Sequence, residues 1–298
     1  MKKYELVICG GGPAGVTAGI YAKRYNLNVL IITKTIGGLL NEMHDIENYP
    51  GFSRITGAEL AVKFEEHLKA LEVPVMHAEI IKIEKTQEGF LIKTTSEEVK
   101  AKAIIIAFGT SKRKLGIPGE EEFKGKGVSY CATCDAAFFK GKTVAVVGGN
   151  DSAAEAALLL TEHAEKVFVI YRGKKLRATP ILTEKVYSNP KIKVIHETVI
   201  TEILGKDFVE KIKLSNGEEL EVQGVFIEAG SLPSTEPVAE LEIKTDESGA
   251  IITDEWMKTN IPGAFAAGDV RKGLLRQVIT AAADGAIAAT SAFKYLRT

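Results

Sequence analysis

The chemistry that the sequence marks most clearly lies in the run Cys131-Ala132-Thr133-Cys134, which is followed directly by Asp135. Two residues between cysteines is the spacing at which one helical turn brings two sulfurs within disulfide reach. If a helix starts here, the partial positive charge at its N-terminus also favours the thiolate form of a cysteine. The residue types and their spacing therefore predict a redox-active thiol pair.

A zinc site is the alternative use of such a pair. It would need two further ligands, commonly from a second close pair of cysteines or histidines. The only other cysteine, Cys9, lies in an apolar run, where we expect a buried small side chain. The five histidines form no closely spaced pair; they are His44, His67, His77, His163 and His196. We therefore expect no metal site.

Length and composition describe the chain that must position this pair. It has 298 residues and a net charge of -1, with 38 basic and 39 acidic residues. The length predicts two domains, and the charge balance gives no electrostatic reason to expect nucleic-acid binding. No apolar run approaches the roughly 18 residues of a membrane span, and the first residues do not resemble a signal peptide. Three cysteines do not make a secreted disulfide framework, so we expect a cytoplasmic protein.

A glycine-rich turn near the N-terminus predicts a dinucleotide site. Gly10, Gly12 and Gly15 have the spacing Gly-x-Gly-x-x-Gly, between an apolar run at 4–9 and a helical pattern. In this motif the glycines allow a tight turn, a close approach of the pyrophosphate and close packing of helix on strand. A glycine turn with no ligand is the plainer alternative. An acid about 20 residues on would hold the ribose, but the next apolar run ends in Thr33-Lys34.

The same pattern of strand, glycine turn, helix and strand recurs at 144–170, where Gly148-Gly149-Asn150 lies between two apolar runs. Two such units predict an α/β fold with two Rossmann-like three-layer domains. A basic irregular stretch at 111–114 and the prolines near 233–237 mark two chain crossings. The runs at 264–269 and 277–295 then return to the first sheet. We expect a FAD-binding domain from 1–112 and 241–298, with a second, nicotinamide-binding and disulfide-bearing domain at 113–240 inserted into it.

Several further segments carry a family resemblance. They are Gly37-Gly38-Leu39-Leu40, Glu47-Asn48-Tyr49-Pro50-Gly51, Gly109-Thr110, Phe265-Ala266-Ala267-Gly268-Asp269 and Arg276-Gln277. Over almost its full length, the chain resembles the low-molecular-weight thioredoxin reductases, which are FAD-dependent homodimeric oxidoreductases of class II. The resemblance implies a flavoprotein whose FAD contacts are Gly10, Gly12, Pro13, Ala14, Gly15, Thr33, Lys34, Gly37, Gly38, Leu39, Leu40, Asn48, Gly109, Thr110, Gly268, Asp269, Arg276, Gln277 and Val278. Leu39 replaces a glutamine that is common in the family.

The resemblance also assigns roles to the thiol pair. It implies that reduced flavin passes electrons to a Cys131–Cys134 disulfide, and that the dithiol then reduces a thioredoxin-like protein. Cys131 attacks the partner, Cys134 lies next to the flavin, and Asp135 donates and accepts the proton. As an alternative, Asp135 caps a helix, which is compatible with the catalytic role.

The second glycine loop departs from the family pattern Gly-x-Gly-x-x-Ala. Asn150 stands at the position where the backbone should approach phosphate, and the end of the next strand reads Tyr171-Arg172-Gly173, where relatives that use NADPH carry His-Arg-Arg. We expect the nicotinamide contacts to be Gly148, Gly149, Asn150, Asp151, Ser152, Arg172 and Arg177. The predicted donor is NADPH with reduced affinity. NADH, alone or with NADPH, is the second choice, and a ferredoxin is the third.

Other functions share these motifs. A related dithiol oxidase, or a reductase of another small disulfide, would differ only in its partner surface. A flavin-binding redox sensor is the non-enzymatic alternative. The intact Cys-Ala-Thr-Cys-Asp run argues against the sensor, since such a protein does not need a reactive pair beside an acid.

Overall fold

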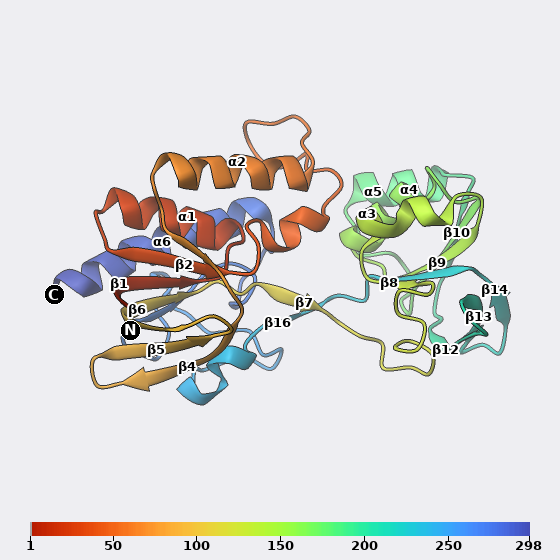
Figure 1. Ribbon diagram of the computed structural model, residues 1–298. Coiled ribbons are helices and arrows are strands. Elements are labelled where there is room, and N and C mark those ends of the chain that lie inside the picture. Colours follow the sequence, from red (N-terminus) through yellow and green to blue (C-terminus); the bar gives the residue numbers. More distant parts are fainter. Residues whose placement is uncertain (1) are drawn as a thin grey trace. The chain divides into compact units, whose positions relative to one another are not determined.

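The computed structural model describes residues 2–298, which form two compact units (Figure 1). Unit 1 comprises residues 2–111 and 232–298, and unit 2 comprises residues 112–231. The second unit is therefore inserted into the first. No helix within residues 2–298 is long and apolar enough to cross a membrane.

Unit 1 is built on a seven-stranded sheet with the order β3-β2-β1-β6-β5-β4, in which β17 also pairs with β6. Strands β1, β2, β3, β6 and β17 run parallel, while β4 and β5 are antiparallel to their neighbours. The elements are β1 (Lys2–Cys9), α1 (Pro13–Arg24), β2 (Val29–Thr33), η1 (Gly38–Glu42), α2 (Gly57–Ala70), β3 (Val75–His77), β4 (Ile80–Thr86), β5 (Gly89–Thr94), β6 (Glu98–Ile106), η3 (Glu236–Leu241), β17 (Ala264–Ala266) and α6 (Val278–Arg297).

Alternation along β1 explains why this sheet is covered on both faces. Leu6 and Ile8 belong to a core formed with α1, α2 and α6, whereas Val7 and Cys9 belong to a second core formed with β4, β5 and η3. All four side chains are fully buried. Successive side chains of a strand point to opposite faces, so this apolar run is typical of a parallel strand buried on both sides.

Helices α1 and α6 approach each other closely because small residues line their contact. A Cβ on Gly285 of α6 would lie 2.1 Å from the backbone oxygen of Ala14, at the start of α1. Ala288 and Ala289 of α6 are fully buried in the same core as Ala18 of α1. The alanine-rich helix expected at 277–295 thus supports the glycine loop from which α1 begins.

Unit 2 contains a five-stranded sheet with the order β11-β10-β9-β15-β8, and all of these strands are parallel. A separate antiparallel sheet has the order β12-β13-β14. The elements are β8 (Val128–Ser129), α3 (Ala132–Asp135), η2 (Ala136–Phe139), β9 (Thr143–Val147), α4 (Asp151–Leu160), β10 (Lys166–Ile170), α5 (Pro180–Ser188), β11 (Ile192–Ile195), β12 (Ile200–Gly205), β13 (Val209–Leu214), β14 (Glu219–Glu221) and β15 (Gly224–Ile227). The predicted α/β class with two Rossmann-like domains is confirmed.

The chain crosses between the units at two short strands, β7 (Thr110–Lys112) and β16 (Ser231–Pro233), which pair with each other. The first crossing lies within one residue of the expected boundary at 112. The second differs, because residues 232–240 group with unit 1 and not with the inserted unit. The reason is η3, whose Val238 and Leu241 are buried in the core under β4 and β5. Prolines alone did not reveal this short apolar element.

Candidate functional site

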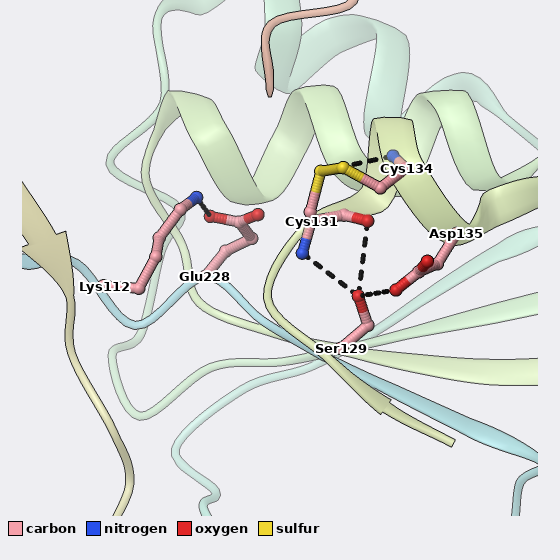
Figure 2. Close-up of a disulfide and its surroundings, with 6 residues drawn as sticks. All are labelled: Lys112, Ser129, Cys131, Cys134, Asp135 and Glu228. Carbon is pink, nitrogen blue, oxygen red and sulfur yellow. Dashed lines mark hydrogen bonds and ion pairs between the residues drawn. A yellow bond between two sulfur atoms is a disulfide. The ribbon is translucent and has the colours of Figure 1, made fainter. Parts of the chain in front are cut away.

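The thiol pair lies where strand β8 ends and a short helix begins. Cys131 and Cys134 form a disulfide with a Cα–Cα distance of 5.3 Å (Figure 2). Cys131 is the N-cap residue of α3, and its sulfur accepts a hydrogen bond from the backbone N–H of Cys134 at 3.2 Å. A thiolate on Cys131 would be stabilised by this N–H group, since charged acceptors form the stronger hydrogen bonds.

Ser129, the last residue of β8, joins Asp135 to the cysteine turn. Its Oγ lies 2.6 Å from Oδ2 of Asp135 and accepts a hydrogen bond from the backbone N–H of Cys131 at 3.0 Å. The oxygen of Cys131 lies 3.2 Å from the same hydroxyl. Figure 2 shows the side chains of Ser129 and Asp135 pointing toward each other below the disulfide. Ser129 is 6% exposed, so this bond is shielded from competing water.

Tyr130 anchors the segment that carries the disulfide. Its hydroxyl donates to Oε1 of Glu120 at 2.6 Å, and Glu120 also accepts from the backbone N–H groups of Leu115 and Gly116. Burial opposes ionisation of Glu120, but these hydrogen bonds outweigh it and hold its pKa below the usual value of 4.5. Burial and the Glu120 carboxylate both raise the pKa of Tyr130. The pair fixes the backbone directly before Cys131.

A buried ion pair lies on the other side of the disulfide. Nζ of Lys112 is 2.8 Å from Oε2 of Glu228, and the Glu228 side chain is only 8% exposed. Glu228 follows β15, which pairs in parallel with β8, so its carboxyl group lies beside the cysteine turn (Figure 2). No motif in the sequence predicts this pair, because its two residues lie in segments interpreted as a linker and a strand end.

The first glycine loop has the geometry of an anion site. Gly10 has φ of +122°, and a Cβ on Gly15 would lie 1.9 Å from the backbone oxygen of Gly10. At Gly12, the N-cap of α1, the only atom within 4 Å of an added Cβ is the oxygen of Gly37, at 3.8 Å. No side chain caps this helix. Its first N–H groups therefore remain available to a phosphate at an open, positively polarised helix start.

Distant FAD residues converge on this loop. The N–H of Gly37 donates to the oxygen of Gly11 at 2.8 Å, and a Cβ on Gly268 would lie 3.0 Å from that of Ala14. Farther along, Nδ2 of Asn48 donates to Oε1 of Gln277 at 3.1 Å. Residues separated by more than 200 positions in the sequence are thus brought together.

Asp269 is the acid that fits a flavin ribityl chain. Its side chain makes no hydrogen bond to any of residues 2–298, and burial raises its pKa, partly offset by Arg276. The turn that holds it is tied down by Asp284 of α6, which accepts from the N–H of Gly268 at 3.1 Å and pairs with Arg271 at 2.7 Å. A half-buried acceptor with no protein donor suits a hydroxyl-bearing ligand, so the residues present fit FAD.

The ends of strands β2 and β3 open onto a cavity of about 600 Å³, lined by Lys34, Thr35, Ile36, Gly38, Asn41, Glu42, Glu65 and His77. Two predicted FAD residues at the end of β2 already have protein partners. Thr33 donates its hydroxyl to the oxygen of Thr35 at 2.8 Å, and Lys34 pairs with Glu79 at 2.7 Å. Leu40 is buried and Leu39 is 38% exposed, so only Leu39 retains a free apolar surface.

The second glycine loop has a different helix start. Asn150 caps α4, and its Oδ1 accepts from the N–H of Ala153 at 3.2 Å. Ser152 is exposed. Arg172 and Arg177, in the loop that follows β10, are also exposed. The backbone N–H of Arg177 donates to the oxygen of Gly149, which places Arg177 beside the loop, but the N-terminus of α4 is already capped.

Most of the chain matches one known protein family. The family described as pyridine nucleotide-disulphide oxidoreductase matches residues 4–285. The chain belongs to this family. Pyridine nucleotide-disulphide oxidoreductases use a flavin and a nicotinamide cofactor, which agrees with the two glycine loops.

Within this family, the chain is similar to proteins named thioredoxin reductase. Thioredoxin reductase of Bacillus subtilis (strain 168) is 44% identical over 302 residues, covering 99% of this chain and 95% of the relative. The crystal structure of Lactococcus lactis thioredoxin reductase matches with a TM-score of 0.96 at 43% identity, covering 99% of both chains. A ferredoxin-flavin thioredoxin reductase from Clostridium acetobutylicum is 34% identical, with a TM-score of 0.57, and covers 100% of this chain and 99% of its own. The resemblance to thioredoxin reductases is confirmed.

Some parts of the site had no sequence signal. Ser129, Glu120, Glu228 and Asp284 stand outside the motifs, and only the folded structure shows which residues they contact. Cys9 is fully buried, and burial strongly raises the pKa of its thiol, so it is not a reactive group. No group of three or more histidine, cysteine, aspartate or glutamate side chains that could hold a metal occurs within residues 2–298.

Proposed function

We propose that this protein is a thioredoxin-disulfide reductase whose working thiols are Cys131 and Cys134. The observation that carries the proposal is the disulfide at the start of α3, with Asp135 held by Ser129 beside it. The family membership supplies a flavin as the electron source, and the first glycine loop and Asp269 fit that cofactor. Relatives that cover nearly the full chain bear the name thioredoxin reductase.

When bound, FAD supplies two electrons to the disulfide. The residues that would hold it lie around the open start of α1, at Gly37 and Gly38, at the Asn48–Gln277 contact and at Asp269. Cleavage of the S–S bond by two electrons leaves two sulfur anions, one of which takes up a proton. Asp135 is placed to deliver that proton, because Ser129 holds its carboxyl group next to the cysteine turn.

The dithiol then reduces a disulfide of the partner by exchange. The Cys131 thiolate attacks one partner sulfur, which breaks the partner's S–S bond and forms a mixed disulfide. Cys134 next gives its proton back to Asp135 and attacks Cys131, which breaks the mixed disulfide, releases the partner and restores the Cys131–Cys134 bond. The N–H of Cys134, which points at the Cys131 sulfur, stabilises the attacking thiolate. The partner leaves as a dithiol with two electrons and two protons, one passed on from Asp135 and one taken from solvent.

The electron donor that we propose is NADPH, bound weakly, with NADH as the alternative. Four exposed cations follow β10, namely Arg172, Lys174, Lys175 and Arg177. A cluster of positive charge near the ribose end favours the 2′-phosphate of NADPH. The missing arginine at Gly173 removes one bidentate contact, so discrimination against NADH should be small.

We also propose that the protein acts in the cytoplasm as a homodimer, on a thioredoxin-like protein. These assignments rest on the resemblance to thioredoxin reductases. Light scattering coupled to size-exclusion chromatography tests the dimer. A monomer at micromolar concentration would contradict it.

The function is tested by coupled reduction of insulin disulfides with NADPH and a thioredoxin. Wild type should precipitate insulin only when both are present. Oxygen consumption in the absence of thioredoxin distinguishes the dithiol oxidase. Turnover that needs oxygen and not thioredoxin would replace the reductase proposal with the oxidase.

A further inference from the structure

The two glycine loops of this chain present their helices to phosphate in opposite ways. Helix α1 begins after Gly12, which has φ of -72° and no side chain to cap the helix. Helix α4 begins after Asn150, which has φ of -96° and a side chain that accepts from the N–H of Ala153 at 3.2 Å. Because N–H groups in the first turn are the ones that bind a pyrophosphate, the second loop already uses one of them internally.

Two further contacts close the start of α4. The N–H of Arg177 donates to the oxygen of Gly149 at 2.6 Å, and the N–H of Thr179 donates to Oδ1 of Asp151 at 2.6 Å. The segment that follows β10 is thereby fastened to the glycine turn at both its backbone and its first helical residue. The contact with Thr179 also holds the negatively charged Asp151 carboxylate next to the helix start. This carboxylate opposes the approach of an anion.

The ring of Tyr171 fills the space between the same two segments. A Cβ on Gly149 would lie 2.5 Å from this ring, and a Cβ on Gly173 would lie 2.6 Å from it. Tyr171 is only 8% exposed. An arginine at position 173 is therefore sterically incompatible with Tyr171 as it stands. Tyr171 and Gly173, which both differ from the family pattern, therefore belong to one packing arrangement. In it, the Tyr171 ring fills the space between the glycine turn and the segment that follows β10.

We propose that Asn150 is an affinity-determining residue of the nicotinamide site. A nicotinamide dinucleotide must displace the Asn150 side chain from the Ala153 N–H before its pyrophosphate can bind to α4. This self-capping makes the site weak for both NADPH and NADH, and it rests on the proposed function. The surrounding cations still attract the nucleotide, since the side chains of Arg172, Lys174, Lys175 and Arg177 form no ion pair within residues 2–298.

The decisive variant is Asn150→Gly, which gives α4 the same N-cap residue as α1. Glycine is tolerated at this position with little loss of helix stability, so the variant should fold and bind FAD. Its KM for NADPH, measured by bleaching of the flavin absorbance under anaerobic conditions, should fall about threefold to tenfold, as for one freed hydrogen bond. Asn150→Asp keeps the capping oxygen and adds a negative charge, so its KM should rise.

The reciprocal change tests the same principle at the other loop. Gly12→Asn installs the asparagine cap on α1, where an added Cβ meets only one atom, at 3.8 Å. The FAD content per chain of the purified variant should be several-fold lower than that of wild type. This readout depends on no nicotinamide and no thioredoxin.

The outcomes separate this inference from the proposed function. A KM for NADPH that is unchanged or higher in Asn150→Gly would overturn the inference, as would flavin that is not bleached by either nicotinamide in that variant. The disulfide half of the reaction is measured separately, by reducing the flavin with dithionite and following its reoxidation by oxidised thioredoxin. Failure of that step would overturn the proposed function and not the role of Asn150.

Discussion

The hydroxyl of Ser129 lies 2.6 Å from a carboxyl oxygen of Asp135 and simultaneously accepts the backbone N–H of Cys131 at 3.0 Å. One small side chain thus connects the proposed proton carrier to the backbone of the attacking cysteine. A hydroxyl can either donate to a carboxylate or accept from a carboxylic acid. The contact therefore persists in both protonation states of Asp135.

Ser129→Ala should slow the disulfide half of the reaction and leave the flavin half intact. Without the hydroxyl, Asp135 loses its fixed position, and we expect reoxidation of reduced flavin by thioredoxin to be about tenfold to a hundredfold slower. Rapid-mixing absorbance measures both halves. Ser129→Thr keeps the hydroxyl and should recover most of the rate. Equal rates in Ser129→Ala and wild type would show that Ser129 has no positioning role.

Glu120→Gln should destabilise the chain in a pH-dependent manner. Because hydrogen bonds hold the pKa of Glu120 below 4.5, its stabilising contribution is fully present above that pH and is lost as the pH falls through the lower native value. We expect a difference of about 2 kcal/mol in the free energy of unfolding at pH 7. Urea denaturation at pH 7 and pH 3.5 should show the difference shrinking. Tyr130→Phe, which removes one of the bonds, serves as a milder control.

Lys112→Met should destabilise unit 2 by removing the ion-pair partner of the buried Glu228 carboxylate. The Lys112 side chain is 27% exposed, so solvent screening reduces the loss to about 1–3 kcal/mol. The double variant Lys112→Met with Glu228→Gln removes the charge and should recover part of this loss. Urea denaturation measures both. A double variant less stable than the single one would contradict this account of the pair.

Asp269→Asn should weaken FAD binding without harming the flavin-free fold. The unpaired carboxylate has a raised pKa because of burial, so its charged form lowers the stability of the empty protein at neutral pH. Replacing it by the neutral amide should leave the unfolding midpoint of the flavin-free chain equal or higher at pH 7, while the Kd for FAD rises at least tenfold. A flavin-free variant with a clearly lower midpoint would show that the loss of FAD reflects misfolding.

The fold could be predicted from the sequence where glycine and apolar runs alternate, because each strand–turn–helix unit is local. The CATC pair and the FAD loops were predicted for the same reason. The residues that complete the site were not. Glu228 lies beside the cysteine turn through the pairing of β8 with β15, and η3 joins unit 1 through burial of two apolar side chains. Long-range packing of this kind leaves no periodic pattern in the sequence.

The central claim is that electrons leave the flavin through Cys131 and Cys134. It is tested most directly by mixing anaerobically reduced, FAD-bound enzyme with oxidised thioredoxin and following the return of the oxidised flavin absorbance. Wild type should be reoxidised with one thioredoxin disulfide reduced per flavin. Cys134→Ser, with FAD still bound, should show no reoxidation above the rate without thioredoxin. Reoxidation of Cys134→Ser at the wild-type rate would contradict the account.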